Sequence, residues 1–277
     1  MYLTKEALLA AMEEIAPRAL AESWDNVGLL IDCGQGFYKK ALFALELTEE
    51  VAKEAEELGA DLLVTHHPVM LFGVKRLDQA TAESRAMLRL IQNGVSMFAA
   101  HTNFDCCATG TNALLAEELG LLNLQPMLPA EDGAVGMGRV GELPAPLRFE
   151  EFARQVARVL KAKGVRTAGD PARVVRCVAV CTGAGLMVKE ALRAGAEVIV
   201  TGDVKHHQAA EAVGQGLWVV DAGHFETEQP AVKRLFAGLQ QRYNQLKYNA
   251  QKEQTTEFCL SRVEKPVLSA LVWTDRE

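Results

Sequence analysis

Short apolar segments alternate with helical patterns along most of this chain, and that alternation restricts its possible folds more than any other feature. The strand-like segments are Ala41–Leu47, Asp61–Thr65, Val95–Ala100, Val174–Val180, Glu197–Thr201 and Leu217–Asp221. The helical patterns are Thr48–Leu58, Thr81–Asn93, Thr109–Leu119, Phe149–Lys163, Leu186–Ala194 and Lys205–Val213. The alternation predicts an α/β fold with largely parallel sheets flanked by helices.

The chain also contains what looks like an internal duplication. Residues 57–65 read ELGADLLVT and residues 193–201 read RAGAEVIVT, which gives in both a helix end, Gly-Ala, an acidic residue, three aliphatic residues and Thr. A weaker pair is QNGVSMFAAHT at 92–102 and GQGLWVVDAGH at 214–224. Duplication predicts two similar α/β domains, although two unrelated strand–helix units could share such an ending.

We place the first domain at residues 1–124, with a later helix at 226–248 packing back on it, and the second at 125–225. Residues 125–146 are rich in Pro and Gly and are predicted to connect the two halves. The tail at 249–277 has no assigned role.

All six histidines lie just after one of four predicted strands. They are His66, His67, His101, His206, His207 and His224. Ligands of open parallel sheets bind beyond the carboxyl ends of the strands, so a binding region is expected there if the halves face each other. Imidazole and carboxylate together suit zinc, iron, manganese or nickel.

The segment VTHHP at 64–68 is the sharpest local signal. Adjacent side chains on an extended segment point to opposite sides, so His66 and His67 are expected to serve two different ions. Pro68 disfavours helical geometry at His67 and keeps the pair extended.

The segment GHFETE at 223–228 supplies a second group of donors. If a helix starts near Gly223, His224 and Glu228 lie one turn apart on the same face, and the Glu carboxylate could bridge two ions. Asp105, within HTNFD, could complete the shell of one ion. His101 has several open roles: ligand, partner of a ligand, proton carrier or structural residue, while Asp203 and His206 are expected to orient ligands.

Residues 136–141, GMGRVG, match the pattern of a dinucleotide-binding loop in form. Because Glu142-Leu143-Pro144 follows them, no helix opens there and the required strand–turn–helix context is missing. The glycines are instead expected to permit close packing or a bulge in an extended segment.

Composition and net charge restrict the partners that this protein is expected to have. Hydrophobic residues make up 49% of the chain, as in ordinary soluble globular proteins, and the net charge of −7 disfavours nucleic acid as a partner. No segment approaches the roughly 20 apolar residues of a membrane span, so no membrane association is expected. The N-terminus lacks the features of a signal peptide, which places the protein in the cytoplasm with reduced, mostly buried cysteines.

Six motifs in order resemble the Nif-three-like family, also called the GTP cyclohydrolase I type 2 family. They are SWDNVGLL (23–30), VTHHP (64–68), HTNFD (101–105), GMGRVG (136–141), TGD…HH (201–207) and GHFETE (223–228). The resemblance implies a ring-shaped homohexamer with two divalent metal ions per subunit, zinc, iron or manganese, between two similar domains. The ligands it implies are His66, His67, Asp105, His224 and Glu228, with Glu228 as the bridge.

The leading functional hypothesis is a dinuclear metal-dependent hydrolase like GTP cyclohydrolase I type 2. Two ions would lower the pKa of a bridging water, and the resulting hydroxide would attack a carbon or phosphorus centre of a small substrate such as a nucleotide. His101 would carry the proton as the catalytic residue. The alternative is a non-enzymatic, metal-binding hexameric scaffold or regulatory protein.

Overall fold

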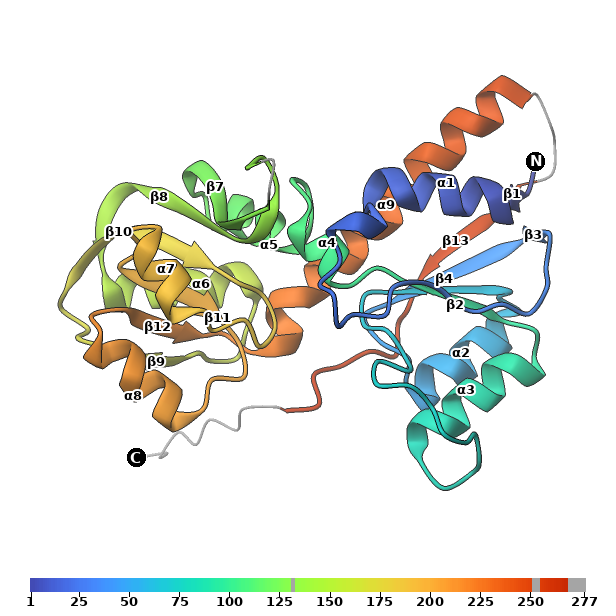
Figure 1. Cartoon of the computed structure of the whole chain (residues 1–277), viewed down its shortest axis with the longest axis horizontal. Coiled ribbons are helices and arrows are strands. Elements are labelled where there is room, and N and C mark those ends of the chain that lie inside the picture. Colours follow the sequence, from blue (N-terminus) through green and yellow to red (C-terminus); the bar gives the residue numbers. More distant parts are fainter. Residues whose placement is uncertain (131–132, 251–254, 269–277) are drawn as a thin grey trace, which may run out of the picture. The chain divides into compact units, whose positions relative to one another are not determined.

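The structure, a computed structural model, describes residues 1–130, 133–250 and 255–268. It divides the chain into two compact units (Figure 1). Unit 1 comprises Met1–Gly110 and Ala231–Glu264, and unit 2 comprises Thr111–Pro230 and Lys265–Glu277. The division falls within the long helix α9 (His224–Ala250), at the proline inside it. In the described ranges, no helix is long and apolar enough to span a bilayer.

Unit 1 is a five-stranded sheet in the order β13-β4-β5-β6-β2, in which only β2 pairs antiparallel. Its strands are β2 (Gly28–Ile31), β4 (Lys40–Ala44), β5 (Leu62–Thr65), β6 (Ser96–Ala99) and β13 (Glu257–Leu260). A short pair, β1 (Leu3–Thr4) and β3 (Phe37–Tyr38), lies apart from this sheet. Its helices are α1 (Lys5–Ile15), η1 (Arg18–Leu20), α2 (Glu49–Leu58), α3 (Ala82–Gln92) and α4 (Thr102–Cys106), besides the later part of α9.

Helices cover both faces of this sheet. Apolar residues of α2 and α3 pack with Leu42, Leu63 and Met97 on one face. Helix α9 lies on the other face (Figure 1). There the Phe236 ring of α9 meets the Phe43 ring of β4 edge-on, with the centroids 5.3 Å apart. Helix α2 shows how local sequence fixes an element, because the Thr48 side chain caps its first turn and Gly59 ends it in a left-handed conformation.

Unit 2 contains a six-stranded sheet in the order β7-β8-β10-β11-β12-β9. Its strands are β7 (Leu122–Pro129), β8 (Gly136–Arg148), β9 (Arg166–Ala168), β10 (Val174–Val180), β11 (Val198–Thr201) and β12 (Trp218–Asp221). Its helices are α5 (Thr111–Glu118), α6 (Phe149–Leu160), α7 (Val188–Arg193) and α8 (His206–Gly214), besides the start of α9. One core cluster joins α5 and α6 to one face of the sheet, and a second joins α7 and α8 to the other.

The predicted α/β class is confirmed, with parallel strands at the centre of each sheet. Antiparallel pairing is found at both edges of the unit 2 sheet and at the β2 edge of the unit 1 sheet, whereas the other edge strand of unit 1, β13, is parallel to β4. The repeated segments occupy matching positions. Strand β5 lies between β4 and β6, and β11 lies between β10 and β12, all parallel within each trio. The strands that the sequence motifs pair therefore have the same place in their own sheets, as duplication predicts.

The segment predicted as a connector, residues 125–146, instead forms most of β7 and β8, which pair antiparallel at the edge of the sheet of unit 2. Prolines are tolerated in β7 because it is an edge strand. Proline lacks a backbone N–H, and at an edge this does not interrupt the hydrogen-bond ladders inside the sheet. The prediction for GMGRVG was correct, since it lies in β8. A Cβ at Gly136 would meet the Leu128 carbonyl oxygen at 2.2 Å, so glycine is required for this close approach.

The cysteine prediction holds in part. Cys106, Cys107 and Cys181 are buried, whereas the other three cysteines are half-buried.

Candidate metal centre

In unit 1, two histidines lie where β5 ends. The last strand residue is Thr65, and the backbone N–H groups of His66 and His67 both donate to the Leu45 carbonyl, at 3.1 and 2.8 Å. The segment has therefore left the regular ladder, so the alternation expected of extended neighbours does not apply. The two rings lie with their centroids 5.3 Å apart.

His101 joins these two from the end of the neighbouring strand β6. One ring nitrogen each of His66, His67 and His101 can be chosen so that all three lie within 4.8 Å of one another. Asp105, one turn later on α4, places Oδ1 3.6 Å from His66 Nε2. His66 is fully buried and Asp105 is nearly so, at 7% exposure. We call these four residues the unit 1 cluster.

Each histidine of the unit 1 cluster is oriented through Nδ1. The acceptors are the Ala100 carbonyl for His66 (2.8 Å), Glu46 Oε2 for His67 (3.4 Å) and Asp25 Oδ1 for His101 (2.9 Å). Carbonyl and ionised carboxylate oxygens only accept, so Nδ1 carries the proton and the lone pair of a neutral ring lies on Nε2. Metal-binding histidines in proteins are held in this way.

Asp25, the acceptor for His101, is itself held by several hydrogen bonds. Its side chain is fully buried, and it also accepts from the backbone N–H of Thr102 at 3.0 Å and from the Thr102 hydroxyl. Burial alone would raise the pKa of this carboxyl, but the hydrogen bonds from His101 and Thr102 outweigh it and lower the pKa to about 2. Asp25 is therefore an anion at any ordinary pH.

In unit 2, a second group of donors lies at the carboxyl ends of β10, β11 and β12. Helix α9 begins at His224, as predicted, and His224 Nε2 lies 2.9 Å from Glu228 Oε2. His224 Nδ1 lies 2.8 Å from Asp203 Oδ2, which fits the orienting role predicted for Asp203. Glu228 is buried, at 3% exposure. We call His224, Glu228 and Asp203 the unit 2 cluster.

Two further residues shape the unit 2 cluster. Asp221, the last residue of β12, accepts from the backbone N–H groups of Val204 and Gly223, at 3.0 and 3.1 Å, and so links the loops that carry Asp203 and His224. Gly183 follows β10 with φ +63°, and a Cβ there would lie 2.1 Å from Glu228 Oε1. Only glycine leaves room for this carboxylate.

These clusters suit a divalent cation. When Nδ1 of His224 donates to Asp203, Nε2 is an acceptor that faces a carboxylate oxygen, and two acceptors at 2.9 Å repel unless a cation or a proton lies with them. Histidine and carboxylate side chains of this kind could hold a metal ion. That His66, His67, Asp105, His224 and Glu228 share one site stays a prediction.

The remaining histidines lie elsewhere. His206 and His207 are exposed at the start of α8, and neither belongs to the donor groups found in the described ranges. Asp25, Glu46 and Gly183 also shape the clusters, although no sequence pattern indicated a role for them. Asp25 belongs to the motif SWDNVGLL, which is the one signal that could have indicated it.

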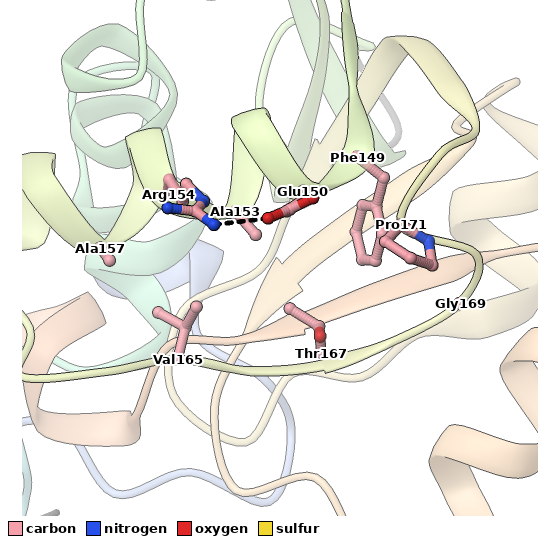
Figure 2. A pocket seen from close by; sticks show the side chains of 9 residues that line it. All are labelled: Phe149, Glu150, Ala153, Arg154, Ala157, Val165, Thr167, Gly169 and Pro171. Atoms are coloured by element: carbon pink, nitrogen blue, oxygen red, sulfur yellow. Dashed lines mark hydrogen bonds and ion pairs between the residues drawn. The ribbon is translucent and has the colours of Figure 1, made fainter. Parts of the chain in front are cut away.

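Unit 2 also contains a pocket of about 380 Å³ between α6, β9 and the loop that follows β9 (Figure 2). Figure 2 shows Phe149, Val165 and Thr167 among its lining residues, with Arg154 paired to Glu150 on the same helix. None of the nine lining residues is a histidine or cysteine, and its charges are already paired. It therefore lacks the donors that distinguish the two clusters.

The chain is similar in sequence to a known protein family. The family model for Duf34/NIF3 (NGG1p interacting factor 3) matches residues 3–257. A "GTP cyclohydrolase 1 type 2 homolog" from Streptomyces coelicolor is 38% identical over 230 residues, which cover 80% of this chain and 81% of the relative. A protein of the same name from Clostridium perfringens is 34% identical over 241 residues, covering 85% and 90%.

A solved structure has the same fold. The crystal structure of a Bacillus cereus protein related to NIF3 matches with a TM-score of 0.87 and covers 98% of this chain and 100% of its own. At 24% sequence identity, the likeness concerns the fold alone.

Proposed function

Because the chain belongs to the Duf34/NIF3 family, we propose that it is a metal-dependent hydrolase acting on a small, nucleotide-like substrate. The family membership confirms the resemblance that the six sequence motifs indicated. The proposed ligands are His66, His67, Asp105, His224 and Glu228, which together would hold two ions.

The observation that carries this proposal is the orientation of the histidines. Nδ1 of every histidine in both clusters faces an oxygen that can only accept a hydrogen bond. The Nε2 atoms of these histidines, together with the carboxylates of the clusters, are suited to zinc, iron or manganese. Bound metal ions would supply Lewis acidity and a nucleophilic water at neutral pH. Glu228, buried and held close to His224, is the carboxylate best suited to bridge.

His101 is the proposed proton carrier. Its Nδ1 donates to the buried Asp25 carboxylate, so a proton taken at Nε2 gives an imidazolium next to a permanent negative charge. This pairing keeps the ring in one orientation, as general acid–base catalysis requires. The alternative is that His101 is itself a metal ligand.

The names of the relatives support the proposed substrate class. Both bacterial relatives carry a name that refers to GTP, and hydrolysis of a purine ring or of a phosphoester is within the reach of two-metal chemistry. A small anionic substrate held by cations is also compatible with a protein of net charge −7.

Activity of the purified protein loaded with zinc, iron or manganese tests the proposal, with GTP and a panel of phosphoesters as substrates. We expect His67→Ala to lower turnover by about 100-fold or more, since it removes a proposed ligand. His207→Ala, which removes an exposed histidine of α8, should leave turnover unchanged. Full turnover by His67→Ala would overturn the assignment.

The second candidate is a non-enzymatic, metal-binding scaffold, and the family description favours it by naming an interacting factor. In this case the metal ions would hold together a homohexamer, the assembly that the motif resemblance implies. Native mass spectrometry with and without a chelator tests this candidate. Loss of a hexamer on chelation, together with no turnover on any substrate of the panel, would favour the scaffold over the hydrolase.

A further inference from the structure

Trp24 places an open aromatic surface beside the unit 1 cluster. The residue is 54% exposed, and its indole ring meets the His101 ring edge-on, with the centroids 6.0 Å apart. A large aromatic side chain left open to water next to polar, chemistry-bearing groups is typical of a ligand site, where apolar surface binds the ligand and a few polar groups orient it.

The loop that carries Trp24 is fixed on both sides of the indole. On one side, the backbone N–H of Glu22 donates to the Thr102 hydroxyl at 2.9 Å. On the other, Asp25 binds His101 and Thr102, and the Asn26 side-chain amide donates to the Met70 carbonyl at 3.2 Å. The entropy cost of ordering this loop when a ligand stacks on the indole would therefore be small.

We propose that Trp24 binds the planar nitrogen heterocycle of the substrate by stacking, and that it selects nucleotide-like substrates over simple phosphates. The inference rests on the proposed function and names the part of the substrate that this chain recognises. A separation of 6.0 Å is shorter than a nucleoside, so a ring stacked on Trp24 keeps the rest of the molecule within reach of His101. Indole stacks on any base through its π face, so the site should prefer planar rings in general rather than guanine alone.

Calorimetric titration of the metal-loaded protein measures each Kd without requiring turnover, and quenching of tryptophan fluorescence is a second readout of stacking on Trp24. The probes are guanosine, GTP and tripolyphosphate, the last of which has no ring. We expect Trp24→Ala to raise the Kd for guanosine about tenfold, since base stacking corresponds to roughly 5- to 100-fold in affinity. Its Kd for tripolyphosphate should not change.

Two further variants keep the test sharp. Trp24→Phe retains an aromatic face, so it should bind guanosine within about threefold of the original affinity while losing the fluorescence quench. Phe37→Ala removes another exposed aromatic residue, one that stacks on Tyr2, and should alter neither quench nor Kd.

The inference is overturned if Trp24→Ala binds guanosine as tightly as the unchanged protein. It is also overturned if the substitution alters the native mass instead of the guanosine Kd, because Trp24 would then be a contact between copies. If guanosine binding depends on Trp24 but the protein turns over no substrate, the hydrolase proposal is contradicted and the stacking role of Trp24 is supported. If Trp24→Ala turns over substrate with an unchanged KM, the hydrolase proposal is supported and the stacking role is contradicted.

Discussion

Gly183→Ala is the substitution whose effect can be worked most directly from the structure. The new Cβ would lie 2.1 Å from Glu228 Oε1, 3.0 Å from Glu228 Cδ and 3.3 Å from His224 Nε2. A normal contact needs roughly 3.5 Å, so the Glu228 carboxylate oxygen must move away by about 1.4 Å. A designed site tolerates a displacement of only about 0.5 Å, so metal binding should suffer.

The expected result is a Kd for zinc raised by about 10- to 100-fold, the range seen when groups that orient metal ligands are lost. The assay is competition with a chromophoric chelator, combined with urea unfolding to measure stability. Alanine at φ +63° should also destabilise the fold by about 1–2 kcal/mol, because the left-handed conformation brings Cβ close to the backbone.

Gly195→Ala is the matched control. Gly195 has φ +83°, and a Cβ there would meet nothing within 4 Å, so the variant carries the backbone cost without touching Glu228. It should lower stability by a similar amount and leave the zinc Kd unchanged. Equal zinc affinity for the two variants would refute the reasoning that Gly183 is there to make room for Glu228.

Three further predictions concern the carboxylates around the clusters. Asp203→Asn, which weakens the bond to His224 Nδ1, should raise the zinc Kd about tenfold in the same assay. Asp25→Asn should lower the free energy of unfolding by about 1.5–3 kcal/mol at pH 7; since the folded pKa is about 2, this advantage of the carboxylate should vanish as pH falls from about 4 towards 2, as followed by urea unfolding. Burial raises the pKa of Glu264 to about 7 from 4.5, so the folded state holds this proton and loses stability as pH rises from about 4.5 to 7. Glu264→Gln still offers an acceptor to the Leu45 N–H, so urea unfolding should show it up to about 3 kcal/mol more stable above pH 7 and equal to the unchanged protein near pH 4.

Much of the architecture could be predicted because local pattern determines it. The strands at 174–180 and 198–201 and the helix at 49–58 lie where the strand-like and helical sequence patterns predict them. The Pro- and Gly-rich segment at 125–146 was misjudged, because an edge strand accepts prolines and a close strand pair requires glycines, so composition alone suggested a loop.

The candidate site divides in the same way. His66, His67 and His224 could be placed because each lies within three residues of the end of a strand. Asp25 could not, since it contacts His101 from 76 residues earlier, out of an irregular loop that no periodic pattern describes. Gly183 was missed because its role lies in the space it leaves for a side chain 45 positions away, and sequence spacing carries no record of that space.

Strand β13 has a consequence for how the protein is made. It completes the sheet of unit 1 beside β4, and Thr256 just before it accepts a hydrogen bond from the backbone N–H of Leu3, 253 residues away. During synthesis, the sheet of unit 1 therefore cannot be completed until residue 260 has been translated. Residues 111–230, which belong to unit 2, can collapse before that point. The segment translated first is thus among the last to reach its final form, and until then β4 presents a bare edge that a chaperone or a neighbouring chain could occupy.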